Sequence, residues 1–527
     1  MYNFVMKNAV LNKVKDIFEK YKYYILIASI IFILFCVAGY SKSHNDYRLY
    51  INENEINLTY GIYELDGKQY IHIDDLTELF KDNVYYDRIS GKLIITTHNN
   101  LVKLSKTDSK YFLKNNNSNY INLKNIIQCI DYNLVIAGYN IYLYNLNSVE
   151  GTIQKNRTEL FDKQTGKVIC LLSKQDKVKV ILNEDKVKNN QKQISVETNI
   201  QGKMYYGYVL NKNVLYEYTP VIQTENNKKI ILVKAQDKVS TSTNVQNIDM
   251  VAFDMYRLSG SNILSKLEYT NNTPQSIKVI ATVNNGQKSS NYDSDIVSSM
   301  LNSDINRYEV IEQILKGVKN ISGVNLDFSN FKLSDNENYI QFVKELAAML
   351  HKNDKILIVN IPNLQNIGVN EISKFVDYII IQPYSARTIA SKTSGPISSI
   401  VYVEQAVQGI IKKVDNVNKV ILEVPAYTIL WTERRGTVIN TEQYTMNTME
   451  MYLKENKIQP KLDNSSGQNY VNYTKGITTY KMWLEDEYSI TKKTEFVNKY
   501  GLAGLSIYKS GYEQKNIYTS ILKILNK

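Results

Sequence analysis

The C-terminal half of this chain is predicted to fold as a (β/α)8 barrel, because short apolar runs alternate with helical periods from residue 249 to the end. Seven strands are clear in this region, and a weak eighth is expected near Leu264–Tyr269. At 527 residues the chain is too long for one compact core, so smaller units are expected before the barrel. The clear strands begin at Met250, Lys278, Gly323, Lys355, Tyr378, Lys419 and Leu505.

Helices are predicted on both sides of the strand that begins at Gly323, because apolar residues recur there at helical spacing. The stretch from about 428 to 487 is too long for a simple connection and is expected to form an inserted α/β subdomain. The predicted buried faces are Tyr308, Ile311, Ile314, Leu315 and Val318 in the preceding helix, and Tyr339, Phe342, Val343, Leu346 and Leu350 in the following one.

The segment Tyr24–Tyr40 contains 17 residues without a charge, which suits a short transmembrane anchor. Lysines outnumber acidic residues before it, so residues 1–23 are expected to form a cytoplasmic tail, with the bulk of the chain outside the cell membrane. A cleaved signal peptide is the alternative, with Val37 and Gly39 as the small residues before the cut, and the protein would then be secreted.

Residues 47–148 contain an internal repeat, in which the segment that begins at Tyr70 is echoed by the one that begins at Tyr120. Each copy is predicted to form a strand, a short helix and a strand pair. The repeat resembles the domain at the N-terminus of some copper amine oxidases, which bacterial envelope proteins reuse as a stalk. No copper ligands accompany the match, so the resemblance implies a spacer or a contact with the cell wall.

Residues 151–218 alternate short β-rich runs with polar turns and are predicted to form a small β-barrel. The closing segment Gly202–Leu210 resembles the final strand of bacterial Src-homology-3 (SH3)-like domains. That resemblance implies binding of wall peptides, and a plain structural barrel is the alternative. The polar, Ser/Thr-rich residues 235–248 are predicted to be a linker, with the barrel spanning 249–527.

The formal charge of +11 indicates either a solvated basic surface or attraction to an anionic wall polymer or membrane surface. No zinc-finger spacing, phosphate-binding loop or basic-aromatic block indicates a nucleic-acid partner. The three cysteines and four histidines show no metal-ligand spacing, so neither a metal nor another cofactor is expected.

The strand that begins at Gly323 ends in a carboxylate. Asn325, Asp327 and Ser329 are two residues apart and therefore share one face of the strand. Active groups of such barrels lie at the carboxyl ends of the strands. An unpaired buried charge is costly, so Asp327 requires either an internal partner or a ligand.

Several motifs in chain order resemble glycoside hydrolase family 18, in the branch of spore-cortex and cell-wall N-acetylglucosaminidases. Residues 322–329 resemble its signature D-G-x-x-x-D-x-E, with Ser322 at the first Asp and Ser329 at the final Glu. The further matching segments are 278–286, 380–385 with 394–396, 424–432, 483–490 and 501–508.

The resemblance implies a substrate-assisted mechanism, in which a Glu protonates the leaving oxygen and the substrate's acetamido group attacks the anomeric carbon. Asp327 matches the Asp that orients this group, and Tyr384 matches the Tyr that hydrogen-bonds it. Ser329 replaces the acid, Ser385 replaces a supporting Asp and Tyr508 replaces a Trp. The residues expected to contact a sugar are Asn325, Gln382, Tyr427, Trp431 and Tyr508.

These observations predict a membrane-anchored bacterial envelope protein that binds N-acetylglucosamine-containing cell-wall glycan, such as peptidoglycan, without efficient hydrolysis. One alternative is an active glycosidase that uses a relocated acid, with Glu423 as the candidate and Asp254, Asp335 and Glu337 as weaker ones. A further alternative is a protein–protein scaffold in sporulation or division.

Overall fold

The computed structural model describes residues 47–526, apart from 114–118, 147, 183–191, 218–227, 242, 287–292, 330–331, 363–366 and 386. Of the described residues, those within 47–86 and 104–217 form one compact unit, and those within 87–103 and 228–526 form another. No helix in the described part of the chain is long and apolar enough to cross a membrane. The predicted anchor Tyr24–Tyr40 lies outside the described residues.

The same order of secondary-structure elements occurs twice in the region of the predicted repeat. Strand β4 (Lys68–His72) leads into α2 (Ile73–Leu79), and β8 (Tyr120–Asn122) leads into α3 (Leu123–Ile127). His72 and Asn122 cap these helices at matching positions of the two copies, and β4 pairs with β8 in antiparallel fashion. The likeness to copper amine oxidases stays a prediction. The remaining strands are β1 (Arg48–Ile51), β2 (Asn54–Ile56), β3 (Ile62–Leu65), β5 (Val84–Asp87), β6 (Lys92–Thr96), β7 (Leu101–Ser105), β9 (Asn133–Ala137) and β10 (Asn140–Tyr144).

The next segment forms a seven-stranded antiparallel sheet in the order β13-β12-β16-β15-β14-β11-β17. The closing segment needs a glycine at position 207, because any Cβ atom there would clash with the Phe161 carbonyl oxygen on the neighbouring strand. The likeness to SH3-like domains also stays a prediction. The strands are β11 (Ser148–Ile153), β12 (Thr158–Phe161), β13 (Val168–Leu172), β14 (Lys177–Ile181), β15 (Gln193–Ile200), β16 (Lys203–Leu210) and β17 (Val214–Tyr216).

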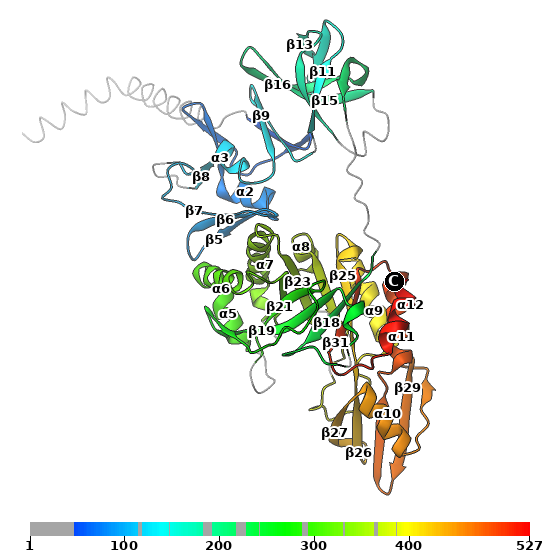
Figure 1. Ribbon diagram of the computed structural model, residues 1–527. Helices are drawn as coiled ribbons and strands as arrows, with labels where there is room; N and C mark the ends of the chain where they lie inside the picture. The colour runs from blue at the N-terminus through cyan, green and yellow to red at the C-terminus, as the bar shows by residue number, and fades with distance from the viewer. Residues whose placement is uncertain are drawn as a thin grey trace, which may run out of the picture. The chain divides into compact units, whose positions relative to one another are not determined.

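The second unit contains a closed barrel of eight parallel strands, shown in Figure 1. The first strand, β18, pairs with both the second strand and the last, which closes the sheet. In order the strands are β18 (Ile230–Ala235), β19 (Met250–Gly260), β21 (Lys278–Asn284), β22 (Gly323–Asp327), β23 (Ile356–Pro362), β24 (Tyr378–Gln382), β25 (Val420–Pro425) and β31 (Gly504–Tyr508).

The expected eighth strand near Leu264–Tyr269 was wrong. That region holds β20 (Ile263–Lys266), which pairs with β19 in antiparallel fashion and takes no part in closing the barrel. The eighth strand is β18, which precedes the predicted linker. Residues 235–248 therefore do not separate two domains, because they connect the first two strands of the barrel.

The helix after β22 is α7 (Asn336–His351), and the apolar face that the sequence predicts for it is buried. In α6 (Asp304–Gly317) the predicted face was wrong at Tyr308, which is 43% exposed because the buried stripe runs through Val310, Ile311 and Ile314. The other helices are α5 (Ser294–Leu301), α8 (Val369–Ser373), α9 (Ile400–Ile411), α11 (Glu487–Lys499) and α12 (Ile517–Leu525).

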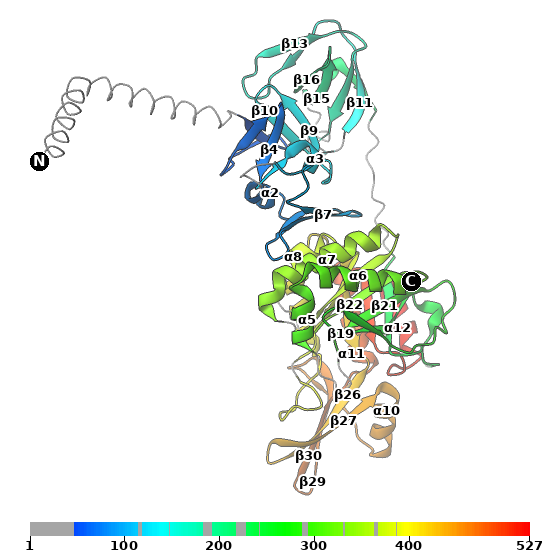
Figure 2. The same ribbon diagram turned by 90° about the vertical axis from the view of Figure 1, so that its left-hand side faces the viewer.

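An insertion lies between β25 and α11 and forms a five-stranded antiparallel sheet with one helix, visible at one end of the barrel in Figures 1 and 2. It was expected to be α/β. Tight turns such as Arg435–Gly436, where both residues have positive φ, make consecutive strands antiparallel instead. The elements are β26 (Tyr427–Arg434), β27 (Thr437–Thr445), α10 (Met446–Glu455), β28 (Lys461–Asp463), β29 (Gln468–Lys475) and β30 (Thr478–Trp483).

Candidate functional site

A layer of polar side chains crosses the barrel interior toward the carboxyl ends of the strands. Beneath it lies an apolar layer that includes Leu232, Ile280, Ile358 and Ile380. Because strand side chains alternate between the two faces, the residue two positions later on each strand also points inward. The polar layer consists of one residue from each strand: Lys234, Asp254, Thr282, Asn325, Asn360, Gln382, Glu423 and Ser506.

Lys234 links two carboxylates in this region. Its Nζ atom lies 3.1 Å from Asp327 Oδ2 and 3.0 Å from Glu423 Oε2. Burial by itself would lower the pKa of Lys234, but the charges of Asp327 and Glu423 outweigh burial and raise that pKa above its usual value. Lys234 is therefore a charged group, and it is the internal partner that the sequence required for Asp327.

Glu423 does not fit its predicted role as a relocated acid. Its carboxylate is fully buried, and Oε1 accepts hydrogen bonds from Tyr384 Oη at 2.8 Å and from Gln382 Nε2 at 2.9 Å. Oε2 faces Lys234 and accepts a third hydrogen bond from Ser506 Oγ at 3.2 Å. A carboxylate whose two oxygens are both occupied in this way has none left to protonate a glycosidic oxygen.

Tyr384 is positioned by Glu423. Burial, together with the charge of Glu423, raises the pKa of its hydroxyl well above the usual value, so the hydroxyl stays protonated. The proton points at Glu423 Oε1, whereas the family resemblance implied that it would meet the substrate. Asp327 is more accessible, with 22% of its side chain exposed.

Ser329 occupies a backbone position that a single amide side chain fixes. Its N–H donates to Asn285 Oδ1 at 2.9 Å, and its carbonyl oxygen accepts from Asn285 Nδ2 at 2.7 Å. The loop that would carry the family's acid is therefore well positioned, but it carries a hydroxyl, which is far too weak an acid at neutral pH.

The three weaker acid candidates differ in their surroundings. Burial and the nearby charge of Asp327 raise the pKa of Asp254 to about 6. Asp335 is buried at the start of α7, where its Oδ2 accepts a hydrogen bond from Ser298 Oγ. Glu337 is exposed in the first turn of the same helix. Only Asp254 belongs to the polar layer.

The predicted aromatic contacts divide into two groups. Trp431 is only 1% exposed and packs in the insertion against Ile397, Ile429 and Val438, so it offers no ring face to a sugar. Tyr427 and Tyr508 are partly exposed and meet edge to face, with ring centroids 6.3 Å apart. These tyrosines lie where the insertion joins the barrel.

Two asparagines of the polar layer are incompletely hydrogen-bonded within the described part of the chain. Asn325 donates from Nδ2 to Thr282 Oγ1 at 3.2 Å, but its Oδ1 has no partner. Asn360 has no partner for either of its side-chain polar atoms. Both residues are fully buried, so the predicted sugar contact from Asn325 does not reach the surface of this conformation.

Sequence reasoning missed Lys234 and Asn285. Lys234 was overlooked because β18 was placed outside the barrel, although the apolar run Ile230–Val233 directly before it is a signal for a buried strand. No signal in the sequence marks Asn285 as the residue that holds Ser329. Among the described residues, no group of three His, Cys, Asp or Glu side chains is placed to hold a metal ion.

The closed parallel barrel, with its polar layer and Asp327 at a strand end, is a (β/α)8 fold, in which active sites lie at the carboxyl ends of the strands. Residues 204–513 match the profile of the glycosyl hydrolases family 18, and the chain belongs to this family.

Among known proteins, the uncharacterized glycosylase YvbX of Bacillus subtilis is 24% identical over 245 residues, which cover 44% of this chain and 70% of that protein. The class V chitinase of Nicotiana tobaccum has the same fold, with a TM-score of 0.50 and 13% identity over 57% of this chain and 99% of that one. The Bacillus megaterium spore cortex-lytic enzyme SleL aligns at a TM-score of 0.49 and 14% identity, over 62% of this chain and 78% of that one.

Proposed function

We propose that this chain is a non-hydrolytic member of family 18 that binds N-acetylglucosamine-containing cell-wall glycan at the carboxyl ends of its barrel strands. The observation that carries the proposal is the ion pair between Lys234 and Asp327, at 3.1 Å. Two residues after Asp327, the family's acid position holds Ser329. The site thus has a serine at the family's acid position and a cation beside its aspartate.

The missing acid accounts for most of the expected loss of hydrolysis. A positioned general acid is typically worth about 10²–10⁴ in rate. Ser329 cannot supply a proton, and Glu423 is saturated by Lys234, Tyr384, Gln382 and Ser506. The barrel retains the framework of the family but lacks a group at the family's acid position that could protonate a leaving oxygen.

The buried cation of Lys234 is a second reason to expect little hydrolysis. Cleavage of a glycosidic bond passes through a transition state with positive charge on the sugar ring, which a nearby carboxylate stabilises. Lys234 already pairs with Asp327 and shares its charge between Asp327 and Glu423, so the Asp327 carboxylate offers less stabilisation to that developing charge. Binding of an uncharged sugar ring is less affected, because it depends on hydrogen bonds and on the partly exposed Tyr427 and Tyr508.

A paired binding and activity assay tests this proposal. Wild-type protein is expected to sediment with purified peptidoglycan and to release no reducing ends from peptidoglycan or chito-oligosaccharides. Asp327→Ala is expected to weaken sedimentation, whereas Asp295→Ala, an exposed Asp on α5, serves as the matched control. Absence of sedimentation by the wild type, or equal sedimentation of the Asp327 variant, would refute glycan binding by the barrel.

A second candidate function, slow hydrolysis with Asp254 as the acid, is favoured by one observation. The pKa of Asp254 is raised to about 6, so a fraction of this carboxyl group holds a proton near neutral pH. If reducing ends are released, Asp254→Asn should abolish their release while Glu337→Gln leaves it unchanged. That pair of results would replace the non-hydrolytic proposal.

We also propose that the protein is held at the outer face of a bacterial cell membrane. The apolar segment Tyr24–Tyr40 and the lysines before it support this location. The protein is expected in the membrane fraction and accessible to protease added to intact wall-stripped cells. Recovery of the full-length chain from the soluble cytoplasm would contradict it.

A further inference from the structure

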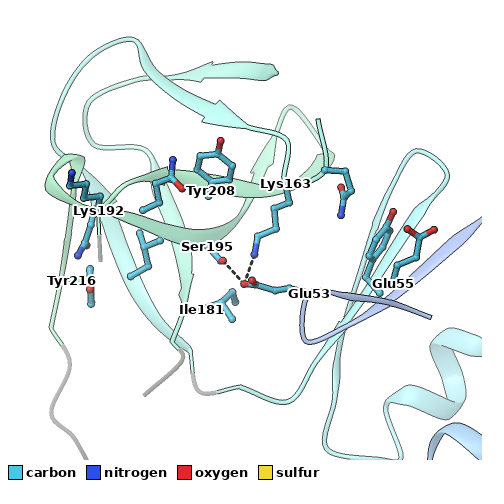
Figure 3. Close-up of a pocket in the computed structure, with 13 residues that line it drawn as sticks. Glu53, Glu55, Lys163, Ile181, Lys192, Ser195, Tyr208 and Tyr216 are labelled. Atoms are coloured by element: carbon cyan, nitrogen blue, oxygen red, sulfur yellow. Dashed lines mark hydrogen bonds and ion pairs between the residues drawn. The ribbon is translucent and has the colours of Figure 1, made fainter. Parts of the chain in front are cut away.

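The N-terminal unit holds a pocket of its own. Its volume is about 560 Å3, within the roughly 300–1,000 Å3 typical of ligand sites. Figure 3 shows Glu55 on one side of it and Lys192 with Tyr216 on the opposite side, with Lys163, Glu53 and Ser195 between them. The walls come from the β1–β2 hairpin and from the seven-stranded sheet.

Glu53 is held at the centre of this pocket by an unusual turn. Ile51 pairs with Asn54, so Asn52 and Glu53 form a two-residue turn, and both have positive φ, 47° and 77°. Such turns favour Asn followed by Gly, since Gly adopts positive φ without steric cost. A Glu at the second position is therefore not explained by the needs of the turn.

The contacts of Glu53 explain why the turn carries a carboxylate. Glu53 Oε1 accepts a hydrogen bond from Ser195 Oγ at 2.8 Å and forms an ion pair with Lys163. Asn52 secures the turn from the other side, because its Nδ2 donates to Asn145 Oδ1 at 2.8 Å. The turn thus presents Glu53 to the pocket and to the sheet.

The charges that line the pocket cancel. Lys163 neutralises Glu53, and the remaining charged lining residues, Glu55 and Lys192, are of opposite sign. A polyanion or a polycation would gain little electrostatic energy there. The lining instead favours a ligand that is uncharged and rich in hydrogen-bonding groups.

Uncharged polar and aromatic groups supply the rest of the lining. The Tyr50 hydroxyl is buried without a hydrogen-bond partner in the described part of the chain. Within the described residues, Gln164 accepts a hydrogen bond from Tyr142 Oη through Oε1 at 3.0 Å, which leaves its amide N–H groups for a ligand. Tyr208 is held by stacking on Phe161, with ring centroids 5.2 Å apart.

We propose that this pocket is a second glycan site, which binds a neutral oligosaccharide of N-acylated hexosamines. Carboxamides match the acetamido and hydroxyl groups of such a sugar, and tyrosine rings match its apolar faces. The site belongs to the N-terminal unit and does not rest on glycan binding by the barrel.

Calorimetric titration of the full chain with an N-acetylglucosamine tetrasaccharide tests the proposal. Tyr216→Ser combined with Gln193→Ala should remove one class of binding sites and leave any barrel site intact, which Asp327→Ala reports separately. Tyr139→Ser, at an exposed tyrosine outside the pocket lining, is the matched control. Binding that only Asp327→Ala reduces overturns the pocket site while sparing the barrel proposal, and no binding by the wild type overturns both.

Glu53→Gly keeps the proposal testable if the double variant misfolds. Gly suits the turn and offsets part of the stability lost with the Ser195 and Lys163 contacts, so this variant should stay folded. It should weaken tetrasaccharide binding roughly tenfold, because Ser195 and Lys163 lose the group that positions them in the pocket. Unchanged affinity in a folded Glu53→Gly variant argues against the site. Tetraglycine is the comparison ligand, and displacement of the sugar by this zwitterionic peptide at equal concentration would identify a peptide site instead.

Discussion

At the scale of single residues, Lys234 is the side chain that pairs with two acidic groups of the barrel interior. The sequence required a partner for Asp327 and left open whether that partner was a side chain or a ligand. The partner is a lysine far away in sequence, which also forms an ion pair with Glu423. A pairing between strands distant in the chain cannot be read from local patterns, because it depends on the closure of the sheet.

Lys234→Met is expected to destabilise the barrel strongly. The substitution leaves Glu423 buried with its charge uncompensated, and breaking a buried ion pair from one side costs about 3–5 kcal/mol. Chemical denaturation of the barrel unit measures the loss.

The matched double variant separates charge from packing. Lys234→Met together with Glu423→Gln should recover most of the stability, because no buried charge then remains unpaired except the partly exposed Asp327. Equal destabilisation of the single and double variants would show that the ion pair is not the cause.

Asp254 gives the barrel a specific dependence on pH. Its pKa is raised in the folded state to about 6, so between pH 4 and pH 6 the folded protein holds a proton that the unfolded chain has released. Stability should therefore fall as pH rises through this range. Asp254→Asn should flatten that part of the profile and raise the melting temperature at pH 7 more than at pH 4, as thermal unfolding at each pH would reveal.

At the scale of elements, strand and helix types were largely predictable. The repeat, the seven clear barrel strands and the buried face of α7 follow from apolar periodicity, which is a local signal. β18 was missed because polar segments flank it, and the antiparallel insertion was missed because tight turns, not periodicity, determine its strand directions. Trp431, expected to contact a sugar, instead packs inside that insertion.

The end of the insertion and the start of α11 carry a motif whose role is structural. Asp486 caps α11 by accepting a hydrogen bond from Ser489 N at 2.9 Å. Glu485 is buried, with Lys493 Nζ 2.6 Å from its Oε2 and Gln468 Nε2 donating to its Oε1 at 3.0 Å. These contacts join the five-stranded sheet of the insertion to the barrel helix.

Lys493→Met should unfold this junction at lower denaturant concentration, with a loss of about 3–5 kcal/mol, since the buried Glu485 would lose the cation that its carboxyl group contacts. Lys492→Met is the matched control, because the neighbouring Lys492 pairs with Glu495 on the surface and such pairs contribute about 0–1 kcal/mol. Similar losses in both variants, measured by denaturant unfolding, would contradict the assignment.

At the scale of the whole molecule, the formal charge of +11 predicts two separable kinds of binding. Attraction to an anionic wall polymer is screened by salt, since the Debye length falls from about 10 Å at 0.1 M to about 3 Å at 1 M. Sedimentation with whole cell wall should therefore decrease between these salt concentrations. Binding of a neutral chito-oligosaccharide should change little, and an equal decrease for both ligands would refute the distinction.

The closure of the barrel by β18 also governs when the site can exist. Ile230 of β18 pairs with Gly504 of β31, so the first strand of the barrel cannot complete its pairing until the last strand is present. Contacts between residues so far apart in the chain form late, because a long loop has to close first. During synthesis, β18 therefore stays without β31 until the chain has been made past residue 504, and any product that ends before residue 504 would leave the barrel open.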